Sequence, residues 1–264
     1  MYLYSLVLDG DCAGSTVTHV YPILKGGALG EGDGWYTQIE YSGPPHAIRI
    51  LGNNKFGFFT GCQNYGSDFT PSTLIFELGT GGFSGWLIPD GQYHGAPEPS
   101  DPDHFFCPAM LAGDPSNHLA YAFRKYYPNL AELSTPYYLA SYMVDTQGNL
   151  LTNSNYTDMP AANIGTLSAM SISPSIKLLA VAGTYGFELF NFDGGNPITK
   201  IGSLVSSGPV TQVAWDKAGH LYVLTTSSLY VYAANSAGVK QTPGSPYSLS
   251  DRGPFSIIAL SLSN

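Results

Sequence analysis

The chain has 264 residues, of which 44% are hydrophobic and only 11% are charged, and its formal net charge is −9. A chain of this length can bury a large core, either in one all-β domain or in two ordinary domains. Ten lysines and arginines provide no basic stripe for a phosphate backbone, which excludes nucleic acid as a partner. No apolar run approaches the roughly 18 residues of a membrane-spanning helix, so we expect no membrane span.

One pattern recurs along the chain: apolar strand, tight turn, apolar strand, loop, and a third apolar strand that ends in a glycine turn. The second strands are expected to begin at Met1, Lys55, His118, Lys177 and His220. Their β-branched and aromatic residues favour strands over helices. Repeats of roughly 40 to 65 residues, each forming one small antiparallel sheet, are typical of a β-propeller.

The first strand of each repeat would lie innermost, around the propeller axis. These strands are expected at His46–Leu51, Cys107–Leu111, Ser168–Ile172, Thr211–Trp215 and Ser256–Leu260. Gly, Asn, Asp, Pro and Ser fill the turns that follow them, and these residues supply positive φ angles or local caps for hairpins.

The two ends of the chain complement each other. Residues 255–260 have the pattern of a first strand with no second strand after it, and residues 1–8 that of a second strand with no first strand before it. Joining them predicts one all-β domain over 1–264, a β-propeller of five four-stranded blades closed by pairing of the C-terminal strand with the N-terminal strand. The blades would span 1–42 with 255–264, 43–102, 103–162, 163–206 and 207–254. The alternative is a fragment of a seven-bladed propeller.

Two long excursions interrupt the compact repeats, at Ile88–Asp103 and Lys125–Pro136. Extra loop length in repeat proteins gathers on the working face, although it can also be surface decoration. Aromatic side chains near the second excursion can stack on a sugar or peptide, or pack between blades: Tyr126, Tyr127, Tyr137 and Tyr138. We therefore predict a non-enzymatic binding protein that recognises a small molecule, glycan or protein on this long-loop face. A purely structural ring is a further alternative.

The fourth and fifth repeats contain a family pattern. SAMSISPSIKLLAVAGTYGFELFNF and TQVAWDKAGHLYVLTTSSLYVYAANSAGVKQTPGSPYSL combine a first strand, D-x-x-G-x-L-Y-V, L-Y-V-Y, a glycine turn and G-S-P-Y. These stretches resemble the bacterial lactonase-like propellers, the YVTN or 6-phosphogluconolactonase-type repeat proteins. The resemblance implies a channelled ring, often bacterial and often exported, and a lactonase-like hydrolase as the alternative function. Members typically have seven blades, and no residue set here maps onto a lactonase site position by position.

Alignment of the first strands predicts a ring of side chains at the channel mouth. The residues that open these strands are polar or weakly polar: His46, Cys107, Ser168, Thr211 and Ser256. A packed core would favour Val or Ile there, so we expect a small polar funnel for a water-bound ligand or ion. The alternative is that these residues only line a water-filled channel, as polar residues do in any propeller.

Further polar residues are expected on the same face: Arg49, Asp103, His104 and Arg252. A histidine beside a carboxylate can act as a general base, and two histidines with an aspartate can hold a divalent metal. A metal ion at His46 or His104 is therefore the one cofactor that we consider, while a solvated or capping role is the alternative for each histidine. No catalytic residue is assigned.

Three cysteines, Cys12, Cys62 and Cys107, match no metal or redox spacing. Cys12 and Cys62 each follow a second strand, so a disulfide between them is one expectation, and small buried thiols are the other. The N-terminal stretch MYLYSLVLDG lacks the basic region of a signal peptide. Low lysine content and Ser/Thr/Asn-rich surfaces nevertheless favour export to a periplasmic or extracellular location.

Overall fold

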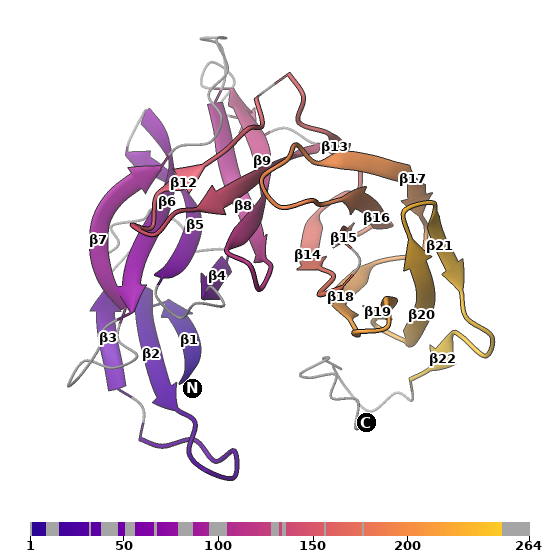
Figure 1. The fold of residues 1–264 in the computed structure, drawn as a ribbon, viewed down its shortest axis with the longest axis horizontal. Helices are drawn as coiled ribbons and strands as arrows, with labels where there is room; N and C mark the ends of the chain where they lie inside the picture. The colour runs from indigo at the N-terminus through magenta and orange to yellow at the C-terminus, as the bar shows by residue number, and fades with distance from the viewer. Residues whose placement is uncertain are drawn as a thin grey trace.

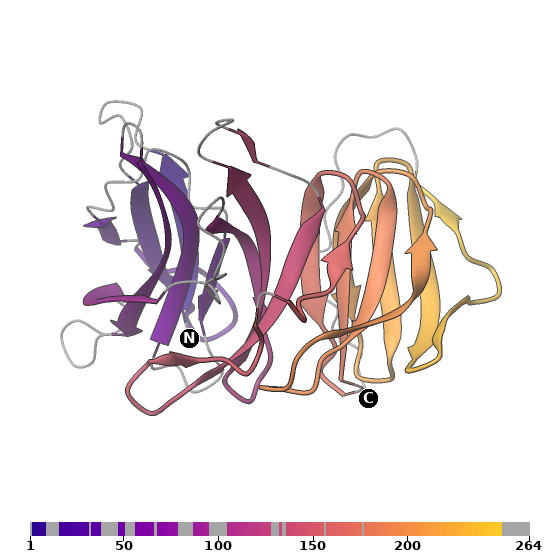
Figure 2. The same ribbon diagram turned by 90° about the horizontal axis from the view of Figure 1, so that it is seen from above.

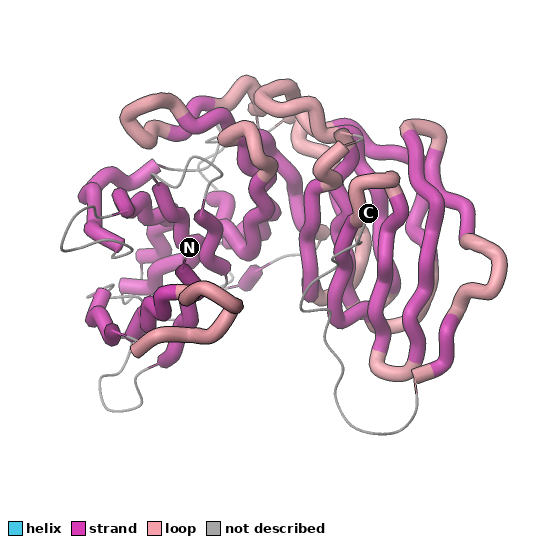
Figure 3. The backbone as a smooth tube through the Cα atoms, turned by 60° about the horizontal axis from the view of Figure 1, so that its bottom comes forward, coloured by secondary structure: helices cyan, strands magenta, loops and turns pink. Residues whose placement is uncertain are grey.

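The computed structural model describes the backbone of residues 2–8, 16–31, 33–37, 47–50, 56–65, 68–78, 87–94, 105–127, 132–133, 136–155, 157–175 and 177–249. Side chains are described for 21–31, 106–125, 127, 136–155, 157–175 and 177–249. Over the described residues all regular elements are β-strands, and neighbouring strands pair antiparallel within five sheets (Figure 3). Within these ranges there is no helix long and apolar enough to cross a membrane.

The first two sheets come from the N-terminal part of the chain. The first contains β1 (Tyr2–Leu8), β2 (Thr16–Pro22) and β3 (Asp33–Thr37) in that spatial order. The second contains β4 (Ala47–Ile50), β5 (Phe56–Tyr65), β6 (Asp68–Leu78) and β7 (Leu87–His94), also in chain order. Both sheets are therefore simple antiparallel meanders.

The next three sheets repeat the meander. The third is built on β8 (Phe105–Gly113), β9 (His118–Tyr127) and β11 (Tyr137–Val144), with the short edge strands β10 (Glu132–Leu133), β12 (Leu150–Leu151) and β13 (Ala161–Ala162). The fourth contains β14 (Leu167–Ile172), β15 (Leu178–Gly183), β16 (Gly186–Asn191) and β17 (Thr199–Val205). The fifth contains β18 (Val210–Trp215), β19 (His220–Thr225), β20 (Ser228–Asn235), β21 (Gly238–Gln241) and β22 (Tyr247–Ser248).

Apolar clusters between the sheets form the core. In β15, all residues are buried, because successive side chains point to opposite faces and both faces are covered. Leu179 packs in one cluster with Leu139 of the third sheet, and its neighbour Leu178 packs in the next cluster with Leu221 of the fifth sheet. The fourth sheet is therefore sandwiched between its two neighbours, as a propeller blade would be.

The sheets follow one another around an arc, with their first strands on the inner side (Figure 1). Strand β14 contacts β8 on one side and β18 on the other, and β8 in turn contacts β4. Viewed from above, the fourth and fifth sheets stand face to face (Figure 2). The all-β prediction is confirmed, and the antiparallel sheets are consistent with propeller blades. The strand expected at Ser256–Leu260, on which closure of the ring depends, lies outside the described residues.

Candidate functional site

Two clefts open at the junction of the third and fourth sheets, at opposite ends of their strands. The hairpin cleft, of about 520 Å³, is lined by the β8–β9, β14–β15 and β16–β17 turns. The loop cleft, of about 370 Å³, is lined by the residues that precede β11 and β14 and by the β15–β16 turn. Strand β9 joins them, with His118 at the hairpin cleft and Arg124 at the loop cleft, roughly 20 Å further along the strand.

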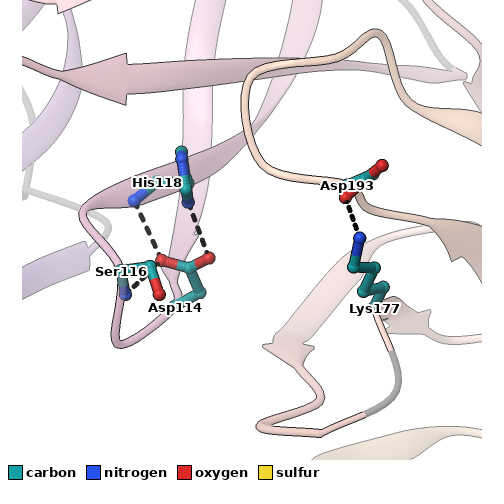
Figure 4. Close-up of polar contacts among 5 residues, drawn as sticks. All are labelled: Asp114, Ser116, His118, Lys177 and Asp193. Atoms are coloured by element: carbon teal, nitrogen blue, oxygen red, sulfur yellow. Dashed lines mark hydrogen bonds and ion pairs between the residues drawn. The ribbon is translucent and has the colours of Figure 1, made fainter.

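In the hairpin cleft, Asp114 organises the β8–β9 turn (Figure 4). Its Oδ1 accepts hydrogen bonds from the backbone N–H groups of Ser116 at 2.7 Å and His118 at 2.9 Å. Its Oδ2 lies 2.8 Å from Nδ1 of His118. A carboxylate only accepts, so Nδ1 carries the proton in this contact, and Nε2 is an acceptor whenever the ring is neutral.

An ion pair lies across the same cleft. Nζ of Lys177 is 2.6 Å from Oδ1 of Asp193, and both side chains are exposed, by 73% and 55%. The hydrogen bond and the charge of Lys177 lower the pKa of the Asp193 carboxyl, with smaller contributions from Asn196 and His118. The cleft therefore contains two carboxyl groups, one ammonium group and one imidazole.

The same aspartate-led turn recurs elsewhere in the chain. Asp216 contacts Nδ1 of His220 at 2.8 Å in the β18–β19 turn, and Asp145 accepts from Nδ2 of Asn149 at 2.8 Å in the β11–β12 turn. Such side-chain contacts stabilise turns in many proteins. The Asp114–His118 contact therefore stabilises the hairpin turn. Any binding of a ligand depends on the other residues that line the cleft.

The loop cleft combines an exposed aromatic ring, neutral polar side chains and one guanidinium group. Tyr185, in the β15–β16 turn, has 61% of its surface exposed, while Tyr137 is buried. The guanidinium of Arg124 lies 5.9 Å from the centroid of the Tyr137 ring. Asn163 and Thr166 also line the cleft and are exposed. Pro136, the last residue of the second predicted excursion, also lines this cleft.

A buried carboxylate fixes the wall of the loop cleft. Glu188 of β16 is only 2% exposed, and its Oε1 lies 2.7 Å from Nζ of Lys200. Its Oε2 accepts a hydrogen bond of 3.1 Å from the backbone N–H of Asn163. Nζ of Lys200 also donates to the carbonyl oxygen of Ala161. The residues before β14 are thereby tied to the fourth sheet.

Two members of the predicted channel ring come close together. Ser168 lies near the start of β14 and donates a hydrogen bond of 2.6 Å to the carbonyl oxygen of Val210, which directly precedes Thr211 in β18. Thr211 donates to the carbonyl oxygen of Leu224 at 3.1 Å. Both hydroxyls are therefore used in joining strands, and neither residue lines the two clefts.

Cys107 differs from the expectation for a polar funnel. It is only 3% exposed, and it is disulfide-bonded, so its thiol is closed to a ligand. Because the chain has three cysteines, its partner is Cys12 or Cys62. The expected disulfide between Cys12 and Cys62 is therefore wrong, since a cysteine forms one such bond.

The remaining predicted site residues cannot be placed in a site. Arg49 lies in β4, where only the backbone is described. The others lie outside the described residues: His46, Asp103, His104, Arg252 and Ser256. Among the side chains that the structure describes, no group of three or more His, Cys, Asp or Glu residues could hold a metal ion.

Sequence reasoning identified part of the loop cleft and missed the rest. Tyr137 was in the predicted aromatic group, whereas Tyr138 packs against Phe106 with ring centroids 5.8 Å apart. Asn163 and Tyr185 were not singled out. Tyr185 sits in a two-residue hairpin turn after an apolar strand, and a large aromatic at a turn position is the signal that could have indicated it.

No protein-family model matches the chain, and no curated protein matches it. A solved structure of a functionally unknown protein from Desulfotomaculum acetoxidans is 12% identical, with a TM-score of 0.55, over 91% of this chain and 68% of that one. Sqt1 from Chaetomium thermophilum is 16% identical, with a TM-score of 0.53, over 86% of this chain and 53% of its own. A gluconolactonase from Xanthomonas campestris is 13% identical, with a TM-score of 0.43, over 87% and 73%.

At these identities the likeness shows the fold alone. The chain spans about two thirds of the length of the Desulfotomaculum protein and about half of that of Sqt1. The likeness to the gluconolactonase, at a TM-score of 0.43, assigns neither a specific family nor an activity to this chain.

Proposed function

We propose that the chain is a binding protein that takes a glycan in the loop cleft. The observation that carries the proposal is Tyr185, which is 61% exposed beside a cleft lined by neutral polar side chains and the guanidinium of Arg124. A tyrosine ring offers a rigid apolar platform with a polar tip, and pockets use a few placed polar groups for orientation. A saccharide has both matching parts, an apolar C–H face and a rim of hydroxyls.

The polar wall is held in place before a ligand arrives. Asn163 is anchored through its backbone by the buried Glu188, and Oγ1 of Thr184 accepts a 3.0 Å hydrogen bond from the backbone N–H of Thr166. Groups that are already ordered lose little conformational entropy on binding. This arrangement favours a ligand of modest size over a protein partner on the same face.

The proposal includes a finer architecture. We infer a closed ring of five blades, in which residues 255–264 pair with β1, and a bacterial, exported protein. The fifth sheet supports closure, because its face away from the fourth sheet is only partly covered, with Tyr222 and Val231 half-buried. The disulfide at Cys107 supports an oxidising compartment.

A glycan panel followed by calorimetry with the best binder tests the function. Tyr185→Ala should weaken binding by about tenfold or more, because the stacking platform is lost. Tyr247→Ala removes another exposed tyrosine, on β22 away from the cleft, and should leave binding unchanged. No glycan bound, or equal effects of the two substitutions, would reject the proposal. Turnover of a lactone panel by the same protein would favour a hydrolase instead.

A further inference from the structure

We infer that the hairpin cleft binds a guanidinium or alkylammonium group. The ammonium group of Lys177 partly occupies this site and competes with such a ligand for Asp193. The cleft lies at the other end of the strands from the loop cleft, so the inference is independent of glycan binding. It depends on three features, which are the acceptors in the cleft, its charge, and its apolar walls.

The first acceptor is Nε2 of His118. Since Nδ1 faces Asp114, Nε2 points away from that carboxylate (Figure 4). None of the described residues donates a hydrogen bond to it. Gly194 of the neighbouring β16–β17 turn packs closely against the ring, because a Cβ atom on Gly194 would come within 3.0–3.2 Å of Nε2, Cε1 and Cδ2. This packing holds the imidazole in place, and His118 lines the cleft.

The second acceptor is the Asp193 carboxylate across the cleft. Its Oδ1 accepts from Lys177, and its Oδ2 is 3.5 Å from Nδ2 of Asn196, at the weak limit of a hydrogen bond. Oδ2 can therefore accept a further donor. A forked guanidinium suits a carboxylate, because its N–H groups lie in one plane.

The charge of the cleft selects a cation. Asp114 and Asp193 carry two negative charges against one positive charge on Lys177, so the net charge is −1 while His118 is neutral. The whole chain, at −9, also attracts cations from a distance. An anionic ligand would face a repulsive field in this cleft.

The walls of the cleft suit a short aliphatic stem. Pro115, Ile172 and Pro174 line it alongside the charged groups, and its volume of about 520 Å³ exceeds that of a single ion. Cationic side chains bury their methylene groups along such surfaces and keep the charged end hydrogen-bonded. The same group could belong to a free amine or to an arginine or lysine of a partner protein.

Lys177 already provides the interaction that the ligand would make. Its ammonium group holds Asp193 at 2.6 Å, but the pair is exposed and exposed pairs contribute little free energy. A ligand that contacts Asp193 and His118 together can therefore displace it. Removal of Lys177 should strengthen the binding of a cation and would weaken the binding of an anion.

Calorimetric titration of the whole chain with agmatine, an alkyl guanidinium, tests the inference. Asp193→Asn and His118→Asn should each weaken binding by about tenfold. Asparagine at 118 should preserve the turn, since Asn149 donates to Asp145 in the same geometry. His220→Asn makes the matched change in the fifth sheet and should leave binding unchanged.

The direction in which Lys177→Ala changes the affinity decides between a cationic and an anionic ligand. Tighter agmatine binding in this variant supports the inference, and weaker binding overturns it. Absence of agmatine binding at millimolar concentration overturns it too, as does an equal loss in His118→Asn and His220→Asn. A capped arginine-containing peptide forms the second arm: tighter binding than agmatine points to a partner protein, and equal binding points to a free amine.

Discussion

The ion pair between Glu188 and Lys200, both in the fourth sheet, allows a quantitative test of how burial changes the contribution of an ion pair to stability. Lys200→Met keeps the aliphatic stem but leaves the Glu188 carboxylate, 2% exposed, without its cation. Breaking a buried pair in this way costs about 3–5 kcal/mol. Lys200 is 31% exposed and Glu188 keeps its hydrogen bond from Asn163, so we expect the lower end, about 3 kcal/mol of unfolding free energy.

The matched control is Lys177→Met. Its ion pair with Asp193 has nearly the same length, 2.6 Å against 2.7 Å, but both partners are exposed. We expect a much smaller loss of unfolding free energy for this variant, because water screens an exposed pair. Urea unfolding, followed by tryptophan fluorescence and circular dichroism together, measures both values. Equal losses in the two variants would refute the argument that burial, rather than pairing itself, determines the cost.

Three further predictions concern other parts of the chain. Gly186→Ala should cost more than about 3 kcal/mol in urea unfolding, because φ at Gly186 is +133° and a Cβ atom would collide with a carbonyl oxygen of β17. Gly238→Ala should cost about 1 kcal/mol, because Gly238 has nearly the same φ, +132°, but lies in open space. Similar losses in the two variants would contradict this reasoning. Burial alone would raise the pKa of the Asp216 carboxyl, but hydrogen bonds from His220 lower it overall, to below 3.8. The stability that this carboxylate contributes is therefore lost as the pH falls through its folded pKa. In Asp216→Asn the free energy of unfolding should depend less steeply on pH in that range. Non-reducing peptide mapping should find a disulfide between Cys107 and Cys62, since β8 lies against β5. Reduction of this disulfide should lower the free energy of unfolding by about 4 kcal/mol. A disulfide between Cys107 and Cys12 would contradict this prediction.

Strand positions could be predicted from the sequence because they depend on local pattern. The expected first strand at Thr211–Trp215 corresponds to β18, and the second strand expected from His220 corresponds to β19. Alternating apolar residues and turn residues act over a few positions, so one repeat suffices to locate them. Alignment of the repeats also placed the first strands of the fourth and fifth sheets next to each other, and a hydrogen bond joins Ser168 to Val210 there.

The clefts could not be predicted in the same way, because residues from different repeats form them. Asn163 and Tyr185 come from segments with no shared motif, and what joins them is the packing of the fourth sheet on the third. Polarity was also a poor guide to the channel ring. Cys107 was selected as weakly polar, but it is a small residue in a packed strand and forms a disulfide. Burial depends on neighbouring sheets, which a strand's own sequence does not specify.

The seam between the third and fourth sheets explains why both clefts occur there. Polar contacts join the two sheets along its length, from Ser141, which donates to the carbonyl oxygen of Asn196, to Glu188, which accepts from Asn163. Apolar packing tolerates small shifts between sheets, whereas hydrogen bonds with fixed partners define one relative position. Each cleft takes walls from both sheets, so its shape depends on that position. A seam fixed at both ends can therefore present two different clefts, one with an aromatic platform and a guanidinium group and one with two carboxyl groups.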